Sequence, residues 1–341
     1  MTIWQIATGE VGRNYSSLFF DHDIMILGPS DGGDAQKNPE KYKGNRVYNF
    51  FQYPKPGDLV LMRYNKEVIG IGLIPSEPDN QYSFQEIFRS VYGWDLCHTR
   101  RVIWTTEVIA EIKNIFSGLN RQQAFSRVHN EAVHEYLKDI DISHFSRSLK
   151  ELPDIDDEEY SNEELGIELF RRGISLRNIE EIINALNQAD RLLKWYWLEK
   201  DNGGRSPSEK EIVAHIILPL FLGLGWSHQQ IAVEWNRVDV AFFKQTPTDE
   251  QNCIMVLEAK GLGKPLDNVF VQPMSYINEL ELDNVALIVT TDGNNIFVYD
   301  ANDENKDPIG FIDIANLRHE YVLPKKINIV DTLVKLQPSS L

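Results

Sequence analysis

Two short apolar segments decide the fold of the second half of the chain: VDVAFF at residues 238–243, and then IMVLEAK at residues 254–260. Short runs rich in Val, Ile and Phe predict buried β-strands. A buried strand should not carry a charge without a partner, yet the first contains Asp239 and the second contains Glu258 and Lys260. Because side chains alternate along a strand, Glu258 and Lys260 point to the same face.

Two carboxylates and a lysine on one sheet face predict a site for a hard divalent metal ion. A cation between the acids offsets the cost of bringing them together, and Mg²⁺ prefers oxygen ligands, so we expect Asp239 and Glu258 to hold it. The ion would lower the pKa of a water and neutralise charge at a phosphoryl centre, while Lys260 orients the water or stabilises a phosphoryl oxygen. The competing interpretation is a surface ion pair between Glu258 and Lys260.

The pattern D-x(n)-E-x-K on adjacent strands resembles the PD-(D/E)XK nuclease superfamily, with Val238 at the position of the proline. The resemblance implies Mg²⁺-dependent hydrolysis of phosphodiester bonds, with Mn²⁺ able to replace Mg²⁺. It also implies the backbone carbonyl of Ala259 as a further metal ligand. The loop after Lys260 lacks the residues of a Walker motif, so no ATP is implied.

The sequence before these strands, residues 206–226, predicts a helix that begins with Ser206 as the N-cap and Pro207 as the first helical residue. The structural interpretation of Glu209 is that it completes a capping box with Ser206. This segment resembles the N-terminal nuclease region of type I restriction motor subunits. The resemblance implies that Glu209, with Glu211 in reserve, brings a further carboxylate to the metal.

Gln272 and Tyr276 stand four residues apart and share one face of a predicted helix. They match the Q-x-x-x-Y motif of the type I-like nucleases, which implies that Gln272 supports the catalytic site and that Tyr276 contacts the DNA backbone. Pro273 is a departure, because a proline bends a helix or forces it to begin late. Residues 286–293 and 295–299 predict a hairpin that resembles the closing hairpin of the same family.

Short strands separated by turn signals predict a small barrel or sandwich for the first 145 residues. The strands are expected at residues 2–8, 23–27, 59–64 and 68–74, the last two joined by a tight hairpin at Asn65-Lys66. This half resembles the PUA-like superfamily, especially the EVE-type domains fused to restriction nucleases. The matching segments are IWQIATG at 3–9, NYS at 14–16, PGD at 56–58 and YGWDLCHTRRVIW at 92–104.

The PUA-like resemblance implies a pocket for a base flipped out of the helix, with an aromatic wall for stacking and polar groups for the pairing edge. The residues expected in the pocket are Trp4, Tyr15, Ser16, Trp94 and Asp95, with Trp104, Ser17 and His98 as further candidates. For each aromatic residue except Trp94, a core position is the competing interpretation. Arg100 and Arg101 are expected to contact DNA phosphates, or else to form a solvated pair.

Residues 146–205 predict a connector, acidic over 150–165 and helical over 176–197. Its role would be to set the distance between the reading site and the cutting site. Helices are also expected over 107–117 and 120–138 from their apolar periodicity.

The composition limits the function classes. A length of 341 residues suggests two domains. The net charge of −17 argues weakly against a nucleic-acid partner, because phosphate contacts need Lys and Arg. No apolar run is long enough for a membrane span, and the N-terminus lacks the features of a signal peptide. Cys97 and Cys253 lie far apart and predict neither a disulfide framework nor a zinc site, so we expect a reducing cytoplasm.

These features predict an α+β or α/β protein of two domains: a PUA-like small β-barrel with helices at 1–145, the connector, and a PD-(D/E)XK domain at 206–341 with a mixed central sheet flanked by helices. The predicted function is that of a modification-dependent, type IV-like restriction endodeoxyribonuclease. It would bind 5-methyl- or 5-hydroxymethylcytosine in double-stranded DNA by base flipping and cut as a homodimer. The alternatives are a non-catalytic binding protein with a degenerate nuclease scaffold and an RNA-directed nuclease.

Overall fold

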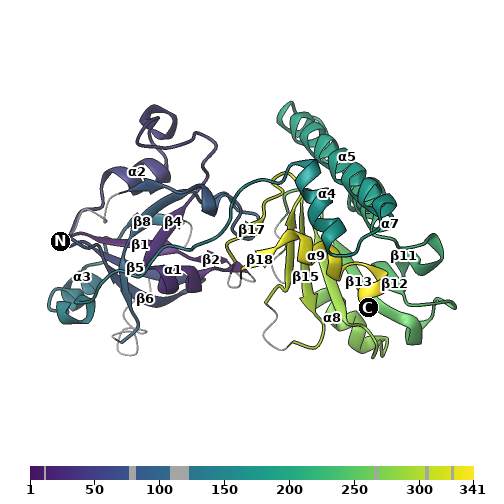
Figure 1. The fold of residues 1–341 in the computed structure, drawn as a ribbon. Coiled ribbons are helices and arrows are strands. Elements are labelled where there is room, and N and C mark those ends of the chain that lie inside the picture. Colours follow the sequence, from purple (N-terminus) through teal and green to yellow (C-terminus); the bar gives the residue numbers. More distant parts are fainter. Residues whose placement is uncertain are drawn as a thin grey trace. The chain divides into compact units, whose positions relative to one another are not determined.

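The computed structural model describes residues 1–10, 13–76, 82–107, 123–264, 266, 269–303, 307–323 and 326–341. In these ranges the chain mixes helices with several sheets and divides into two compact units (Figure 1). Unit 1 comprises Met1–Ile155 with Val322–Pro324, and unit 2 comprises Asp156–Tyr321 with Lys325–Leu341. In the described ranges, no helix has the length and apolar character needed to cross a membrane.

Unit 1 contains a five-stranded sheet in the order β10-β1-β5-β6-β9 and a three-stranded sheet in the order β4-β8-β7. Strands β1 and β5 are parallel, and the other neighbours in these two sheets are antiparallel. The bounds are β1 Ile3–Ala7, β4 Ile24–Leu27, β5 Leu59–Tyr64, β6 Glu67–Leu73, β7 Ser83–Phe84, β8 His98–Arg101, β9 Ile103–Thr105 and β10 Phe125–Arg127. The four strands predicted in this half are confirmed. A small pair, β2 Gly9–Glu10 and β3 Arg13–Asn14, completes the strands described in unit 1.

The helices of unit 1 are short: α1 Ser16–His22, α2 Arg46–Gln52 and α3 Glu131–Leu137, with 3₁₀ turns at Pro39–Tyr42, Glu86–Phe88 and Ile142–Phe145. The helix predicted over 120–138 is wrong at residues 125–127, which form strand β10. Pairing of β10 with β1 buries Phe125 against Trp4, with ring centroids 5.2 Å apart, and this tertiary contact outweighs the local helical pattern. The helix predicted at 107–117 falls almost wholly in residues 108–122, outside the described ranges.

Unit 2 is organised around a six-stranded sheet in the order β11-β12-β13-β14-β15-β16. Its strands are β11 Ile231–Trp235, β12 Val238–Phe243, β13 Cys253–Ala259, β14 Leu287–Thr291, β15 Asn295–Asp300 and β16 Gly310–Asp313. Only the β13–β14 pair is parallel among these strands, so the sheet is mixed, as predicted. A short pair, β17 Glu320–Tyr321 and β18 Ile327–Asn328, lies outside this sheet.

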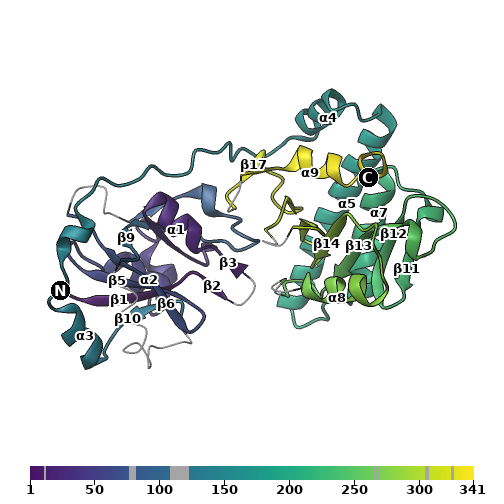
Figure 2. The ribbon, with the colours of Figure 1, turned by 90° about the horizontal axis from the view of Figure 1, so that it is seen from below.

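Helices cover both faces of the unit 2 sheet. They are α4 Asn162–Arg171, α5 Leu176–Asp201, α6 Glu209–Ile212 continued by a π-helical turn Val213–Ile217, α7 Leu218–Gly223, α8 Val271–Glu279 and α9 Ile329–Lys335, with 3₁₀ turns at His228–Gln230, Glu250–Asn252 and Pro338–Ser340. Figure 2 shows α5 and α7 on one side of β13 and α8 on the other. Strand β13 is therefore buried along its whole length.

The residues expected as a connector divide between the two units. Residues 146–155 belong to unit 1, and 156–205 belong to unit 2. The physical reason is packing: α5 lies against α7, and α4 lies against α5 and α9. The apolar stripe predicted in the long helix is thus the stripe that packs onto unit 2.

Candidate functional site

Glu258 lies at the carboxyl end of β13 and is only 2% exposed. Val240 of β12 pairs with Leu257 of β13, so one further step of the antiparallel register brings Asp239 opposite Glu258. Directly opposite residues of an antiparallel pair point to the same face. On the other side of β13, the parallel partner of Glu258 is Thr290 of β14.

Lys260, just beyond β13, begins a chain of hydrogen bonds that reaches helix α8. Its Nζ donates to Glu258 Oε1 at 2.6 Å and to Gln272 Oε1 at 3.2 Å. Gln272 in turn donates through Nε2 to the Tyr276 hydroxyl at 2.9 Å. Pro273 does not displace Gln272, because it occupies the first turn of α8, where a proline costs no intrahelical hydrogen bond.

The Asp239 carboxylate lies beside the end of β13, where Oδ2 accepts a hydrogen bond from the Ala259 amide at 2.8 Å. Burial is the main cause that raises the pKa of Asp239, and the charges of Glu209 and Glu234 raise it further. Burial likewise raises the pKa of Glu258, against the hydrogen bond from Lys260, and the charge of Asp239 adds to the rise. The site therefore holds more negative charge than Lys260 offsets.

The helix that carries Glu209 begins later than predicted. Ser208, not Ser206, is the N-cap, and its capping box is closed by Glu211. Both Ser-x-x-Glu pairs match the capping pattern, and the structure uses the second because Arg205 also binds Glu211, with both distances 2.6 Å. The Arg205 guanidinium and the capping bonds lower the pKa of Glu211 to about 2.

Glu209 therefore takes no part in the capping box of this helix. It is exposed, and its charge raises the pKa of both Asp239 and Glu258. Of the two acids that the sequence left open, Glu209 is the one whose charge acts on both site carboxylates, whereas Glu211 is held by the cap and by Arg205.

One oxygen at the site is buried without a donor. Glu258 Oε2 has no hydrogen-bond partner among the described residues, and the same is true of the Thr290 hydroxyl in the neighbouring strand. Leaving such an atom unsatisfied costs about 1–3 kcal/mol. The sequence did not single out Thr290, because only the register of β13 against β14 distinguishes it from Thr291.

The donor set fits a Mg²⁺ ion that keeps part of its water shell. Across the described residues, no three Asp, Glu, His or Cys side chains gather closely enough to hold a metal by themselves. Mg²⁺ commonly needs only one or two carboxylates, because it retains several waters. Asp239, Glu258 Oε2 and the Ala259 carbonyl at the strand end are the groups present for this role.

Unit 1 contains a cavity of about 570 Å³, here named the Trp94 cavity. Its walls include Tyr15, Trp94 and Asp95, three of the five residues predicted to bind a base. The Tyr15 and Trp94 rings meet edge to face with centroids 6.0 Å apart. Arg46 and Arg63 also line the cavity, but both donate to backbone carbonyls, those of Gly28 and of Asn65 and Gln123.

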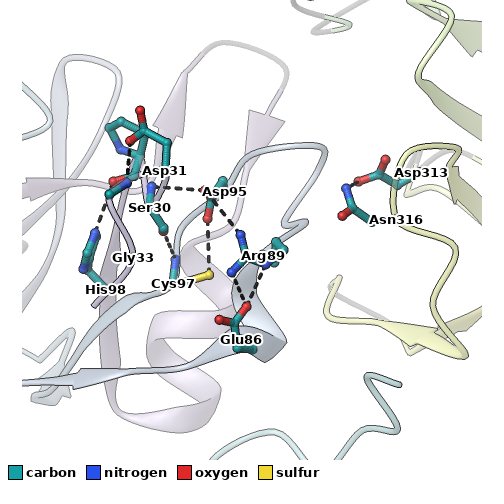
Figure 3. Close-up of polar contacts among 12 residues, drawn as sticks. Ser30, Asp31, Gly33, Glu86, Arg89, Asp95, Cys97, His98, Asp313 and Asn316 are labelled. Carbon is teal, nitrogen blue, oxygen red and sulfur yellow. Dashed lines mark hydrogen bonds and ion pairs between the residues drawn. The ribbon is translucent and has the colours of Figure 1, made fainter. Parts of the chain in front are cut away.

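The position of Asp95 is fixed by a polar network (Figure 3). Its carboxylate accepts from the Ser30 amide at 3.1 Å and from Cys97 Sγ at 3.2 Å, and Arg89 lies 3.9 Å away. The loop before Ser30 presses so closely that a Cβ at Gly28 would lie 1.8 Å from the Asp95 carbonyl oxygen. Glycine is therefore required there for the cavity wall to close.

The other predicted base-binding residues lie elsewhere. Trp4 is a core residue whose Nε1 donates to Asp58 at 3.0 Å, and Trp104 is buried with its Nε1 bonded to the Ile24 carbonyl. Ser16 opens helix α1 and is not among the residues that line the Trp94 cavity within the described ranges. For Trp104 and Ser16 the structure favours a scaffold role, whereas Trp4, although buried, also lines a second cavity of unit 1.

The two arginines predicted to contact phosphates both bind backbone carbonyls of unit 1. Arg100 is buried, donates to the carbonyls of Phe50 and Phe51, and has its pKa lowered to about 10 by burial, so its guanidinium is engaged inside unit 1. Arg101 donates to the Lys150 carbonyl. His98 is buried between the Tyr82 hydroxyl and the Pro29 carbonyl, and burial lowers its pKa, so it stays neutral and structural.

No family model matches the sequence, and a search of the curated proteins finds no significant match. The geometry of the two sites described above therefore carries the functional argument alone.

Proposed function

We propose that this chain is a Mg²⁺-dependent endodeoxyribonuclease in which unit 1 reads a modified cytosine and unit 2 hydrolyses the phosphodiester bond. The observation that carries the proposal is the cluster at the end of β13. Asp239 and Glu258 share a sheet face, Lys260 binds Glu258, and Glu258 Oε2 is buried without a donor in the described ranges. The mixed sheet with helices on both faces supports a PD-(D/E)XK assignment for residues 206–341.

The residues of the cluster have separable tasks. Asp239, Glu258 and the Ala259 carbonyl would hold Mg²⁺, which when bound supplies Lewis acidity and acidifies a coordinated water. Lys260 donates a hydrogen bond to the attacking water or to a phosphoryl oxygen from a position that Glu258 and Gln272 fix in advance.

Tyr276 holds Gln272, so it positions Lys260 indirectly. In this role Tyr276 lies two hydrogen bonds from the Lys260 ammonium, and a contact with the DNA backbone is a second task that we propose for it. Glu209 adds negative charge that favours binding of the cation.

The Trp94 cavity supports the reading half of the proposal. Its volume of about 570 Å³ is in the range of small-ligand pockets. The partly exposed Trp94 ring offers a stacking surface, and a carboxylate such as Asp95 accepts a hydrogen bond from the exocyclic amine of cytosine. Each Asp95 oxygen has a second lone pair beyond those bound by Ser30 and Cys97. We propose on this basis a PUA-like reader in residues 1–145.

The test is cleavage with Mg²⁺ of matched duplexes that carry cytosine, 5-methylcytosine or 5-hydroxymethylcytosine. We expect cleavage of modified DNA only, abolished in Lys260→Ala and retained in Lys264→Ala, an exposed lysine of the same loop that serves as the matched control. Cutting of both strands requires two active sites, so the active species is expected to be a homodimer.

Other outcomes point to the alternatives. Equal cutting of all duplexes would remove the modified-base reader and leave the nuclease. Binding of modified DNA without any cleavage would favour a binding protein on a degenerate nuclease scaffold. Cleavage of an RNA of the same sequence, added as a further substrate, but of none of the DNA duplexes would favour the RNA-directed nuclease.

A further inference from the structure

Unit 1 contains another cavity, of about 900 Å³, which we name the Arg127 groove. It lies along the edge strand β10 and is also walled by β1, by α2 and by the loop that follows α2. The lining residues whose side chains could contact a ligand include Asn49, Tyr53, Lys55, Gln123, Arg127 and His129.

Apart from Tyr53, the ionisable side chains that line the groove are all basic. Lys55, Arg127 and His129 line it, and no Asp or Glu is among its lining residues within the described ranges. The full sequence has 51 acidic residues against 34 Lys and Arg. A groove without acidic lining residues is therefore not expected from the composition alone. Lys55 and Arg127 are both exposed and, over the part of the chain that the structure describes, neither forms an ion pair.

The carboxylate nearest in the sequence to Lys55 is already occupied. Asp58 is buried and accepts from the Thr2 amide, the Trp4 indole and the Lys55 amide at 2.7, 3.0 and 3.0 Å. Its charge is therefore engaged by three N–H groups and not by the Lys55 ammonium. The cationic ends of Lys55 and Arg127 are left for an anionic ligand.

The uncharged lining suits a nucleic-acid strand better than a small anion. Tyr53 is 50% exposed and presents a ring for stacking, and the amides of Asn49 and Gln123 can bind phosphate or sugar oxygens. Cations, amides and an exposed aromatic ring along one groove are the elements of backbone recognition in nucleic-acid-binding proteins.

Gln123 lines both the Arg127 groove and the Trp94 cavity. Its carbonyl is fixed by Arg63 NH2 at 3.1 Å, so the residue that the two share is anchored to β5. A strand that inserts one base into the Trp94 cavity would therefore have the groove beside it for the neighbouring phosphates.

We propose that the Arg127 groove binds the phosphodiester backbone of the DNA strand whose base occupies the Trp94 cavity, with Lys55 and Arg127 as the phosphate contacts. This inference rests on the proposed reading function. It also replaces Arg100, which is buried, as the source of phosphate contacts in unit 1.

The experiment is equilibrium binding of the full chain, without divalent metal, to 5-hydroxymethylcytosine and cytosine duplexes over a range of NaCl concentrations. Each lost phosphate contact lowers the slope of log K against log salt by about 0.9. For Lys55→Gln with Arg127→Gln we expect the slope to fall by about 1.8, equivalent to roughly 60-fold weaker binding at 0.1 M salt. The matched control, Lys41→Gln with Lys43→Gln, removes two exposed charges that line none of the cavities described here and should leave the slope unchanged.

The outcomes separate this inference from the proposed function. Preference for modified DNA with an unchanged slope in the Lys55 and Arg127 variant overturns the groove and leaves the reader. Equal binding of both duplexes with a reduced slope overturns the reader and leaves the groove as a backbone site. No binding of either duplex by the unaltered chain overturns both. Lys55→Arg with Arg127→Lys keeps both charges and should retain the slope, which a merely structural role would not require.

Discussion

Two buried carboxylates of unit 2 lie at the ends of neighbouring strands, and their surroundings differ. Asp292, just after β14, is 4% exposed and accepts from the amides of Gly263, Asn294 and Asn295 at 3.2, 3.1 and 2.8 Å. Glu258, at the end of β13, is 2% exposed and has one donor, Lys260, while its Oε2 has none in the described ranges. Burial raises the pKa of both groups, so the pKa does not distinguish them.

The number of donors distinguishes their roles. A carboxylate saturated by backbone N–H groups is a structural element, and Asp292 ties the loop that follows Lys260 to the β14–β15 turn. A buried carboxylate lowers stability if one of its oxygens has no hydrogen-bond donor, unless a ligand binds that oxygen. Burial is common to both groups, so the oxygen without a donor is the feature that distinguishes Glu258 from Asp292.

Glu258→Gln has the largest expected effect and tests most directly whether Glu258 and Asp292 differ in role. Glutamine preserves the shape and can still accept from Lys260, but it removes the charge that a cation needs. We expect cleavage to fall about 10³-fold, or about 4 kcal/mol in the barrier, with little change in stability. Single-turnover cleavage and a urea unfolding curve measure the two effects. A loss of stability as large as that of an Asp292 variant would remove the distinction.

Asp292→Ala should show the opposite behaviour. It leaves three backbone N–H groups without their acceptor, and buried unsatisfied groups cost about 1–3 kcal/mol each. We expect the free energy of unfolding to fall by about 3 kcal/mol, measured by urea unfolding followed by circular dichroism. Asp292→Asn is the control, since its remaining carbonyl oxygen should recover part of the loss. Equal stability of Asp292→Ala and the unaltered chain would contradict the structural role.

The sequence predicted much of this site because its signals are local. The apolar runs predicted β12 and β13, and the alternation of side chains placed Glu258 and Lys260 on one face, where the structure joins them at 2.6 Å. The spacing of Gln272 and Tyr276 likewise predicted that they share one face of a helix, and the structure adds a hydrogen bond from Gln272 Nε2 to the Tyr276 hydroxyl. The bond from the Gly263 amide to Asp292 and the Glu258 oxygen without a donor could not be predicted, because they depend on the pairing of β13 with β14 across about thirty residues.

Unit 1 was predicted less well for the same reason. Its strands followed from apolar runs and turn residues, but which aromatic residues face a cavity depends on how the sheets pack. Trp4 and Trp104 turned out to lie in the core, while Trp94 lines the cavity together with Asp95. Arg100, polar in sequence, is drawn into the interior by the carbonyls of Phe50 and Phe51.

Glu209 and Glu211 extend the comparison to the helix that faces the site. Glu211 is occupied by its cap and by Arg205, whereas Glu209 acts on the two carboxylates. We expect Glu209→Gln to lower cleavage about tenfold at limiting Mg²⁺, a change of about 1.4 kcal/mol, and to be rescued by more Mg²⁺. Glu211→Gln, the matched control, should leave the cleavage rate within about twofold and lower the melting temperature. The reverse pattern would assign the helix acid to Glu211.

The smallest expected effect is the pH dependence of the free energy of unfolding that arises from Asp239. Burial raises the pKa of Asp239 above its ordinary value of 3.8, so the ionised side chain opposes folding at pH values above the folded-state pKa. This opposition disappears as the pH falls below 3.8, where the side chain is protonated in both states. In Asp239→Asn the amide oxygen can still accept from the Ala259 amide.

Without metal we therefore expect Asp239→Asn to be more stable than the unaltered chain at pH 8 and to melt at a higher temperature. The gain should shrink as the pH is lowered, and added Mg²⁺ should stabilise only the unaltered chain, since the ion binds the ionised acid. Thermal melts at pH 8 and pH 5, with and without Mg²⁺, measure the gain in stability at pH 8, its decrease at lower pH and the stabilisation by Mg²⁺. A variant that is less stable at pH 8 without metal would show that Asp239, like Asp292, is a satisfied structural carboxylate.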